Sequence, residues 1–159
     1  MSTTTTPAST AEDKNDWREN IIESEEGIRQ LLAHARRVAV LGMRTEAHSS
    51  RPAFYVPQYL HSAGLEIIPV PVYHPDATSI LGQKTYQKLV DIPGHVDIVD
   101  VFRRAEDIPG HLDDMIAKRP GAVWFQSGIY NDEAAERLAR AGIKVVQSRC
   151  LMVDYRRVP

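Results

Sequence analysis

The sequence is poor in cysteine, and Cys150 is the only one it contains. A single cysteine cannot form an internal disulfide, and sparse cysteine is typical of a reducing, cytoplasmic setting. No apolar run approaches the roughly 18 residues that a transmembrane helix needs. The N-terminus also lacks the basic and apolar regions of a secretory signal. These absences predict a soluble, cytoplasmic protein with no membrane partner.

Net charge is also low. The 19 lysines and arginines nearly balance the 21 aspartates and glutamates, which gives a formal charge of −2. Nucleic-acid binders usually carry a strong basic excess, so we expect no nucleic-acid partner. The remaining composition is ordinary for a globular protein, with 43% hydrophobic and 25% charged residues. A length of 159 residues favours a single domain.

The first residues differ from the rest of the chain. Residues 1–15 are rich in threonine, serine and proline and almost lack bulky apolar side chains, which predicts a disordered tail. Residues 16–159 are then expected to form the single domain. Apolar residues recur at helical spacing between Asp16 and His34, with Asp16 as a plausible N-cap. This pattern predicts one amphipathic helix that packs against the first strand.

Short apolar runs alternate with helical patterns through the remainder of the chain. Runs rich in β-branched and aromatic residues predict five strands, at 37–42, 66–72, 96–102, 122–126 and 143–147. Helical patterns lie between them, at 52–63, 84–90, 109–118 and 131–141. Asn131 and Gly142 have the residue types that start and stop a helix. The alternation predicts an α/β fold, a doubly wound parallel sheet of about five strands in three α/β/α layers.

In such sheets, ligands bind beyond the carboxyl ends of the strands, where the strand order reverses. The first strand ends at Gly42, and its loop leads into a helix that begins at Pro52. A helix N-terminus attracts phosphate, and the hydroxyls and guanidinium groups nearby suit phosphate oxygens. Those side chains belong to Arg44, Ser49, Ser50 and Arg51. Their alternative role is an ordinary helix cap with solvated arginines.

Two common nucleotide motifs are missing after Gly42. The loop matches neither the G-x-G-x-x-G turn of dinucleotide-binding domains nor the G-x-x-x-x-G-K-[ST] phosphate loop. The second strand runs into Val72, Tyr73 and His74, without the acidic residue that binds an NAD ribose. The sequence therefore disfavours an NAD dehydrogenase and, more strongly, ATP hydrolysis through a phosphate loop.

Several short segments, in order and spacing, carry a family resemblance. They are 38–42, 51–52, 59–60 with Gly64, 68–70, 81–82, 96–103, 124–128 and 149–150. Over about residues 20–157 the chain resembles the small stand-alone CoA-binding proteins, which are similar to the CoA-binding domain of the succinyl-CoA synthetase α subunit. This resemblance implies a Rossmann-like fold whose ligand is coenzyme A or an acyl-CoA.

The resemblance also implies roles for individual residues. Loop residues around Gly42 and Arg51 would hold phosphates, and Val72 and Tyr73 would border the adenine or ribose. The end of the third strand would line the pantetheine path, and Gln126 would close the crevice. The complete implied cofactor-binding set is Gly42, Met43, Arg44, Ser49, Ser50, Arg51, Pro52, Val72, Tyr73, His74, Asp100, Val101, Phe102, Arg103 and Gln126.

The chain departs from the family pattern in two places. Many relatives have Asn-Pro and then a basic residue after the second strand, where this chain has His74 and Pro75. A histidine is a weak substitute for lysine in a phosphate contact near pH 7. Many relatives also carry an aspartate before the Arg-Cys pair, where this chain has Gln147 and Ser148.

No catalytic or metal-binding constellation stands out. None of the six histidines lies in a recognisable motif, and Asp97 and Asp100 should face opposite sides of their strand. We therefore expect a CoA-binding protein that is not an enzyme and holds no metal. A thiol-redox alternative would form a mixed disulfide between CoA and Cys150, with Arg149 favouring the thiolate. A buried structural role for Cys150 competes with it.

Two further alternatives concern ligand and partner. The chain could be a regulatory module for NAD(P) or another nucleotide. It could also be a subunit that presents CoA to an acyl-CoA enzyme, or a homodimer, the commonest assembly of such domains.

Overall fold

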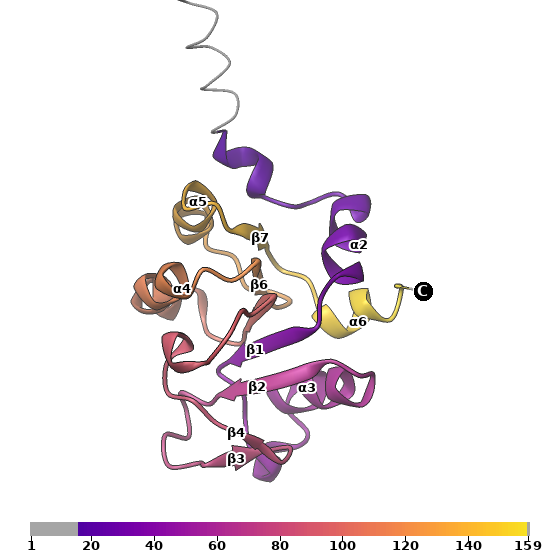
Figure 1. The fold of residues 1–159 in the computed structure, drawn as a ribbon, viewed down its shortest axis with the longest axis vertical. Helices are drawn as coiled ribbons and strands as arrows, with labels where there is room; N and C mark the ends of the chain where they lie inside the picture. The colour runs from indigo at the N-terminus through magenta and orange to yellow at the C-terminus, as the bar shows by residue number, and fades with distance from the viewer. Residues whose placement is uncertain (1–15, 159) are drawn as a thin grey trace, which may run out of the picture.

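The computed structural model describes residues 16–158, so the tail predicted for residues 1–15 lies outside the described residues. Five parallel strands form one sheet in the order β2-β1-β5-β6-β7 (Figure 1). Their bounds are β1 Arg37–Leu41, β2 Glu66–Val70, β5 Ile98–Val101, β6 Ala122–Phe125 and β7 Lys144–Val146. From β1 the chain adds β2 on one side and β5, β6 and β7 on the other. The strand order therefore reverses between β1 and β5, which confirms the predicted doubly wound sheet.

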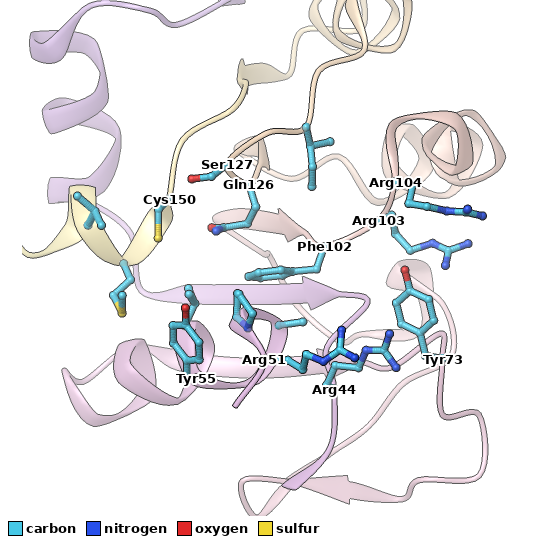
Figure 2. Close-up of a pocket in the computed structure, with 16 residues that line it drawn as sticks. Arg44, Arg51, Tyr55, Tyr73, Phe102, Arg103, Arg104, Gln126, Ser127 and Cys150 are labelled. Atoms are coloured by element: carbon cyan, nitrogen blue, oxygen red, sulfur yellow. The ribbon is translucent and has the colours of Figure 1, made fainter. Parts of the chain in front are cut away.

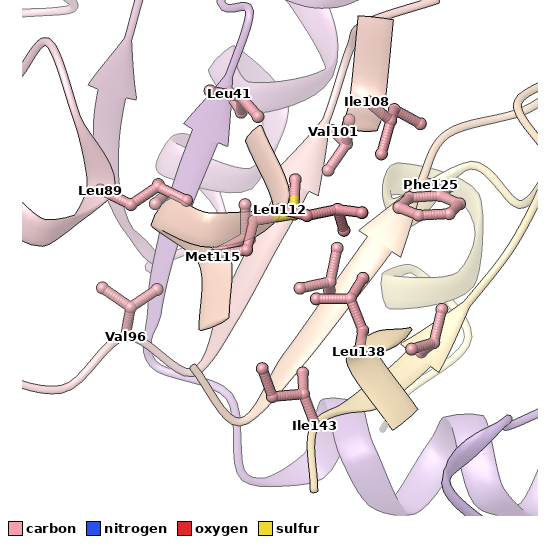
Figure 3. Packing of buried hydrophobic residues seen from close by; sticks show 14 of the residues in the cluster. Leu41, Leu89, Val96, Val101, Ile108, Leu112, Met115, Phe125, Leu138 and Ile143 are labelled. Carbon is pink, nitrogen blue, oxygen red and sulfur yellow. The ribbon is translucent and has the colours of Figure 1, made fainter. Parts of the chain in front are cut away.

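Helices cover both faces of this sheet, as Figure 1 shows. One face packs against α2 (Glu25–Ala33), α3 (Pro52–Ser62) and the short α6 (Leu151–Tyr155). The other face packs against α4 (Leu112–Lys118) and α5 (Asp132–Arg140). Alternate strand residues supply the two cores: Val40 faces the first layer, and Leu41 and Val101 face the second (Figure 3). The three-layer prediction is confirmed.

The helix predicted at 131–141, which has the clearest start and stop signals in the sequence, is present as α5. The Asn131 side chain accepts the Ala134 N–H at 3.0 Å and so caps α5. Gly142 follows the helix with a φ of +86°, a left-handed conformation that glycine adopts without strain. The helix predicted at 131–141 is therefore confirmed within a residue at each end.

The single helix predicted between Asp16 and His34 is wrong. Asp16 caps only a 3₁₀ helix, Trp17–Asn20, by accepting the Arg18 N–H at 3.0 Å. The chain then extends, and Ile22 donates to the Val145 carbonyl at 2.8 Å beside the edge strand β7. Ser24 starts α2 by accepting the Gly27 N–H at 3.0 Å. Pairing with the sheet edge and a second cap divide the segment.

The helix predicted at 84–90 is also wrong. Its first residue belongs to a small antiparallel hairpin, β3 (Ser79–Ile80) with β4 (Gln83–Lys84). The turn uses Leu81 and Gly82, with φ of +54° and +70°, as two-residue hairpin turns require. Only a 3₁₀ turn, Leu89–Asp91, follows.

Three other short elements complete the architecture. The segment around Pro109 is a 3₁₀ helix, Ala105–His111, so α4 starts later than the predicted 109. Another 3₁₀ helix, Glu46–His48, lies in the loop after β1, and α6 follows β7 without having been predicted. No helix in the described part of the chain is long and apolar enough to cross a membrane.

Candidate functional site

A cavity of about 560 Å³ opens at the carboxyl ends of the parallel strands, on the side covered by α3 and α6 (Figure 2). Its walls come from the loop after β1 and the start of α3, the loops after β2, β5 and β6, and the start of α6. This is the predicted location, at the point where the strand order reverses. The residues that line it are Arg44, Arg51, Pro52, Ala53, Tyr55, Val56, Tyr73, Phe102, Arg103, Arg104, Gln126, Ser127, Ile129, Cys150, Met152 and Val153.

Gly42 allows the ends of the two central strands, β1 and β5, to approach each other closely at the floor of this region. Its φ is +90°, and a Cβ at this position would lie 2.3 Å from the Phe102 carbonyl oxygen. Phe102 in turn donates its N–H to the Leu41 carbonyl at 2.8 Å. Only a residue without a side chain permits so close an approach. Gly42 therefore shapes the cavity although it is not one of the lining residues.

One end of the cavity is strongly cationic. Figure 2 shows Tyr73 with Arg44 on one side and Arg103 on the other. The guanidinium carbons of Arg44 and Arg103 lie 4.1 and 4.9 Å from the centre of the Tyr73 ring. Such cation–π contacts contribute about 0.5–1 kcal/mol each at exposed sites. They hold both guanidinium groups at the cavity mouth.

The arginines at this end differ in their partners. Arg104 pairs with Asp107 at 3.0 Å, and Arg103 lies 3.9 Å from the same carboxylate. Within residues 16–158, Arg44 and Arg51 form no ion pair. Their positive charges are therefore available to an anionic ligand.

His111 orients the Arg103 side chain through a hydrogen bond. The Arg103 Nε–H donates to His111 Nε2 at 3.2 Å. Burial, and next the Arg103 charge, lower the pKa of His111, which keeps Nε2 unprotonated and able to accept this bond. A neutral histidine orients Arg103 without cancelling its charge.

The other end of the cavity is largely apolar. The side chains of Tyr55 and Val56 come from α3, and those of Met152 and Val153 come from α6. The Cys150 thiol lies at this end, at the N-cap position of α6 (Figure 2). The cavity thus joins a cationic mouth to an apolar end that carries a thiol.

Gln126 connects the end of β6 to α6. Its side-chain carbonyl accepts the Leu151 N–H at 2.9 Å, a bond that the Cys150 side chain does not supply. Gln126 is 5% exposed, and it is one of the cavity-lining residues. It therefore fixes α6 and Cys150 at the cavity while presenting an amide group to it.

Arg149 has a different role from the one expected for it. Its guanidinium bonds both oxygens of Asp154, at 2.7 and 2.8 Å, and the Glu25 carboxylate at 3.1 Å. These bonds, the one to Asp154 most of all, raise the pKa of Arg149 above its ordinary value. Arg149 thus ties α6 to α2 and provides no unpaired cation beside Cys150.

About half of the predicted site residues meet at the cavity. Those that line it are Arg44, Arg51, Pro52, Tyr73, Phe102, Arg103 and Gln126, together with the redox candidate Cys150. The remaining ones lie elsewhere. Ser49 and Ser50 are exposed in the loop before α3, and Val72 lines a separate, smaller cavity of about 210 Å³. His74 packs against His48 outside the cavity lining.

Three predicted residues are buried in the cores. Met43 is fully buried in the core beneath α3, because the loop turns back and Arg44 donates its N–H to the Ala53 carbonyl at 3.1 Å. Val101 faces the opposite layer from Phe102, as alternation along a strand requires. The side chains of Met43 and Val101 therefore do not reach the cavity.

Asp100 is the third, and its setting is unusual. It is fully buried between Val40 and Trp124 on the neighbouring strands, and neither carboxyl oxygen has a hydrogen-bond partner among residues 16–158. Burial raises the pKa of Asp100 well above its usual range, so the neutral acid is the form this site favours. Asp97 differs, because its carboxylate accepts the N–H groups of Arg36 and Arg37, both at 2.8 Å.

The residues that the sequence did not reveal come mostly from the two flanking helices. They are Ala53, Tyr55, Val56, Arg104, Ile129, Met152 and Val153. Helical spacing from Pro52 would have placed Tyr55 and Val56 on the same face of α3. Met152 and Val153 could not be found in this way, since α6 was not expected. In the described part of the chain, no group of three His, Cys, Asp or Glu side chains is arranged to hold a metal.

Comparison with known proteins identifies the family of this chain. Residues 36–156 match the model of the CoA binding domain family. The chain belongs to this family. It is 34% identical to the uncharacterized protein YneT of Bacillus subtilis (strain 168) over 132 residues, 83% of this chain and 94% of that protein.

Solved structures show the same fold. A Thermus thermophilus protein designated cell-free ID.343 is 40% identical, with a TM-score of 0.79 over 85% of this chain and 98% of its own. A hypothetical protein from Pyrococcus horikoshii OT3 is 28% identical, with a TM-score of 0.74 over 86% and 92%. An acetyl-coenzyme A synthetase of Ca. Korarchaeum cryptofilum shares the fold at 18% identity, over 76% of this chain and 27% of its own, with a TM-score of 0.62.

Proposed function

We propose that this protein binds coenzyme A or an acyl-CoA in the cavity at the carboxyl ends of the strands. The observation that carries the proposal is the division of this cavity into two ends. Coenzyme A has the matching division: a nucleotide with a diphosphate and a phosphate monoester at one end, and a flexible pantetheine arm with a thiol at the other. Membership of the CoA binding domain family supports the same ligand.

The cationic end would hold the phosphates. Arginine forks match phosphate oxygens in two parallel hydrogen bonds, and Arg44 and Arg51 have no competing carboxylate among the described residues. Pro52 begins α3, so the positive end of the helix dipole adds to this field. The proposed position of the diphosphate is therefore beside Arg44 and Arg51.

The pantetheine arm would then run along Phe102 and Gln126 to the apolar end. The Gln126 side-chain oxygen is already bonded to Leu151, which leaves its amide N–H groups for a carbonyl of the ligand. Tyr55 and Met152 would cover the apolar part of the arm. This path ends at Cys150 and brings the ligand thiol close to the protein thiol.

We further propose that binding, not catalysis, is the activity. No histidine, aspartate or glutamate is among the cavity-lining residues, so the site lacks the side chains that most often act as general acid or base. Incubation of the protein with acetyl-CoA should release no free CoA above the rate in buffer. A protein-dependent release of thiol would overturn this part of the proposal.

Isothermal titration calorimetry tests the ligand. Coenzyme A and acetyl-CoA should bind with similar affinity, and NAD should bind much more weakly, because NAD lacks the thiol arm and the phosphate monoester. Tight binding of NAD with no binding of coenzyme A would overturn the proposal. Arg51→Ala should weaken the binding of coenzyme A, and Arg137→Ala, on the opposite face of the sheet, is the matched control for loss of an arginine.

The position of Cys150 favours a second candidate function, thiol exchange. The Cys150 thiolate would attack one sulfur of the disulfide form of coenzyme A, break that S–S bond and release one CoA thiolate. The product is a mixed disulfide between Cys150 and coenzyme A. Intact-mass measurement should show one added CoA that a reductant removes, and none in Cys150→Ser. No added mass in the wild type, or the same mass in the variant, would exclude it.

A further inference from the structure

Two histidines meet just outside the cationic end of the cavity. His48 ends the 3₁₀ helix Glu46–His48 in the loop after β1, and His74 lies in the loop after β2. Their ring centroids are 5.0 Å apart, and the rings are tilted by 34°. Segments far apart in the sequence thus bring two protonatable rings into contact.

Among residues 16–158, neither histidine forms an ion pair with a carboxylate. The Nε2 atom of His74 is buried and has no hydrogen-bond partner among residues 16–158, although the rest of the residue is partly exposed. Burial, then His48, then Arg44 lower the pKa of His74. Glu46, on the same short helix as His48, is engaged by the Leu81 N–H at 2.8 Å. The groups that act on His74 are therefore all cationic or able to become so.

Arg44 links the pair to the cavity. Its guanidinium lies over the Tyr73 ring, both residues line the cavity, and His74 follows Tyr73 directly in the chain. A ligand phosphate beside Arg44 would thus have the two histidines as its next neighbours. Mutual repulsion among the three groups would be relieved by a doubly charged anion.

We propose that His48, His74 and Arg44 form a proton-linked subsite for a phosphate monoester. This inference rests on the proposed function, since the monoester in question is the one on the ribose of coenzyme A. A phosphate monoester carries close to two negative charges near pH 7, whereas each phosphate of the diphosphate linkage carries one. Protonated histidines would donate to its oxygens, so binding takes up protons.

The consequence is discrimination that depends on pH. In the free protein, repulsion and burial keep His74 neutral near pH 7, and an adjacent phosphate restores its proton. The preference for coenzyme A over 3′-dephospho-CoA should therefore grow as the pH falls from 8 to about 6, where the second proton of a phosphate monoester begins to bind.

Calorimetric titration of the full chain with these two ligands at pH 6 and pH 8 is the first test. Coenzyme A should bind about tenfold or more tightly than 3′-dephospho-CoA at pH 6, as the loss of a charge-assisted hydrogen bond implies, and the ratio should be smaller at pH 8. His48→Gln and His74→Gln should reduce the ratio and its pH dependence. His61→Gln, an exposed position on α3, is the matched control and should change neither.

The outcomes separate this subsite from the proposed function. If coenzyme A binds but the two ligands bind equally, or the ratio is independent of pH and of both histidines, the subsite is wrong and the CoA proposal stands.

If coenzyme A does not bind, the proposed function fails. The subsite is then judged by NMR titration with inorganic phosphate, which should raise the pKa of His74. An unchanged pKa would overturn the subsite. Circular dichroism checks that each variant folds.

Discussion

The side-chain oxygen of Gln126 accepts the backbone N–H of Leu151 at 2.9 Å. This bond joins the carboxyl end of a central strand to the first turn of α6, whose N-cap is Cys150. The same glutamine is one of the cavity-lining residues. The Gln126 side chain therefore both positions α6 at the apolar end of the cavity and lines the space where a ligand would bind.

Replacement of Gln126 by leucine should be costly for this reason. Gln126→Leu leaves the buried Leu151 N–H without a partner, which costs about 1–3 kcal/mol of the free energy of unfolding. Urea denaturation measures the loss. Gln126→Glu keeps the acceptor oxygen and should lose less stability. Equal losses in the two variants would show that the bond to Leu151 does not determine the effect.

Gly42 and Gly64 form a matched pair for a second prediction. Both have positive φ, +90° and +105°, but a Cβ at Gly42 would strike the Phe102 carbonyl whereas one at Gly64 would meet nothing within 4 Å. Gly64→Ala should cost about 1–2 kcal/mol, the penalty of a left-handed residue. Gly42→Ala should cost clearly more, because β1 and β5 must also move apart. Denaturant titration compares them, and similar losses would contradict the close approach.

Burial of Asp100 predicts a pH dependence of stability. Its pKa in the folded protein is raised above the unfolded value of about 3.9. Above the unfolded pKa, Asp100 loses its proton in the unfolded chain but keeps it in the folded protein. Its contribution to stability is therefore fully present below the unfolded pKa and declines as the pH rises toward the folded pKa. Within that range the decline is about 1.4 kcal/mol per pH unit.

Asp100→Asn removes this titration while it keeps the shape of the neutral acid. The variant should gain stability over the wild type as the pH rises from 4 to 7, with a difference in unfolding free energy that shrinks toward pH 4. Denaturant titrations at several pH values measure the difference, in which the other titrating groups cancel. A difference that is the same at every pH would contradict the account of Asp100.

Salt and charge should govern the affinity for coenzyme A. Removal of one arginine–phosphate contact by Arg51→Ala should weaken binding about tenfold or more, since a hydrogen bond to a charged group contributes about 1.5–3 kcal/mol. The variant should also show a weaker dependence on sodium chloride. Arg137→Ala should retain wild-type affinity. Calorimetry at two salt concentrations measures both effects, and an unchanged salt dependence in Arg51→Ala would place the phosphates elsewhere.

The fold could be predicted because its signals are local. Alternating strand and helix patterns, the Asn131 cap and the glycine after the first strand each specify backbone geometry over a few residues. The position of the cavity then follows from topology alone, since parallel strands end at one edge and their order reverses beside β1. Arg44, Arg51, Phe102 and Gln126 were found in this way.

What could not be predicted depends on contacts between distant segments. The N-terminal segment does not form one long helix, because Ile21 and Ile22 pair with β7. The short α6 forms where Gln126 supplies its cap, so Met152 and Val153 could not be placed from local pattern. Met43 turns into the core because of a loop closure with Ala53. None of these contacts can be recognised from a local sequence pattern, because each joins segments that are separated in the chain.

A crystal structure of the protein with coenzyme A tests the central claim most directly. The account predicts density for the diphosphate beside Arg44 and Arg51, with the pantetheine arm along Phe102 and its sulfur at the Cys150 end of the cavity. Coenzyme A bound outside this cavity, or bound with its thiol at the arginine end, would contradict it.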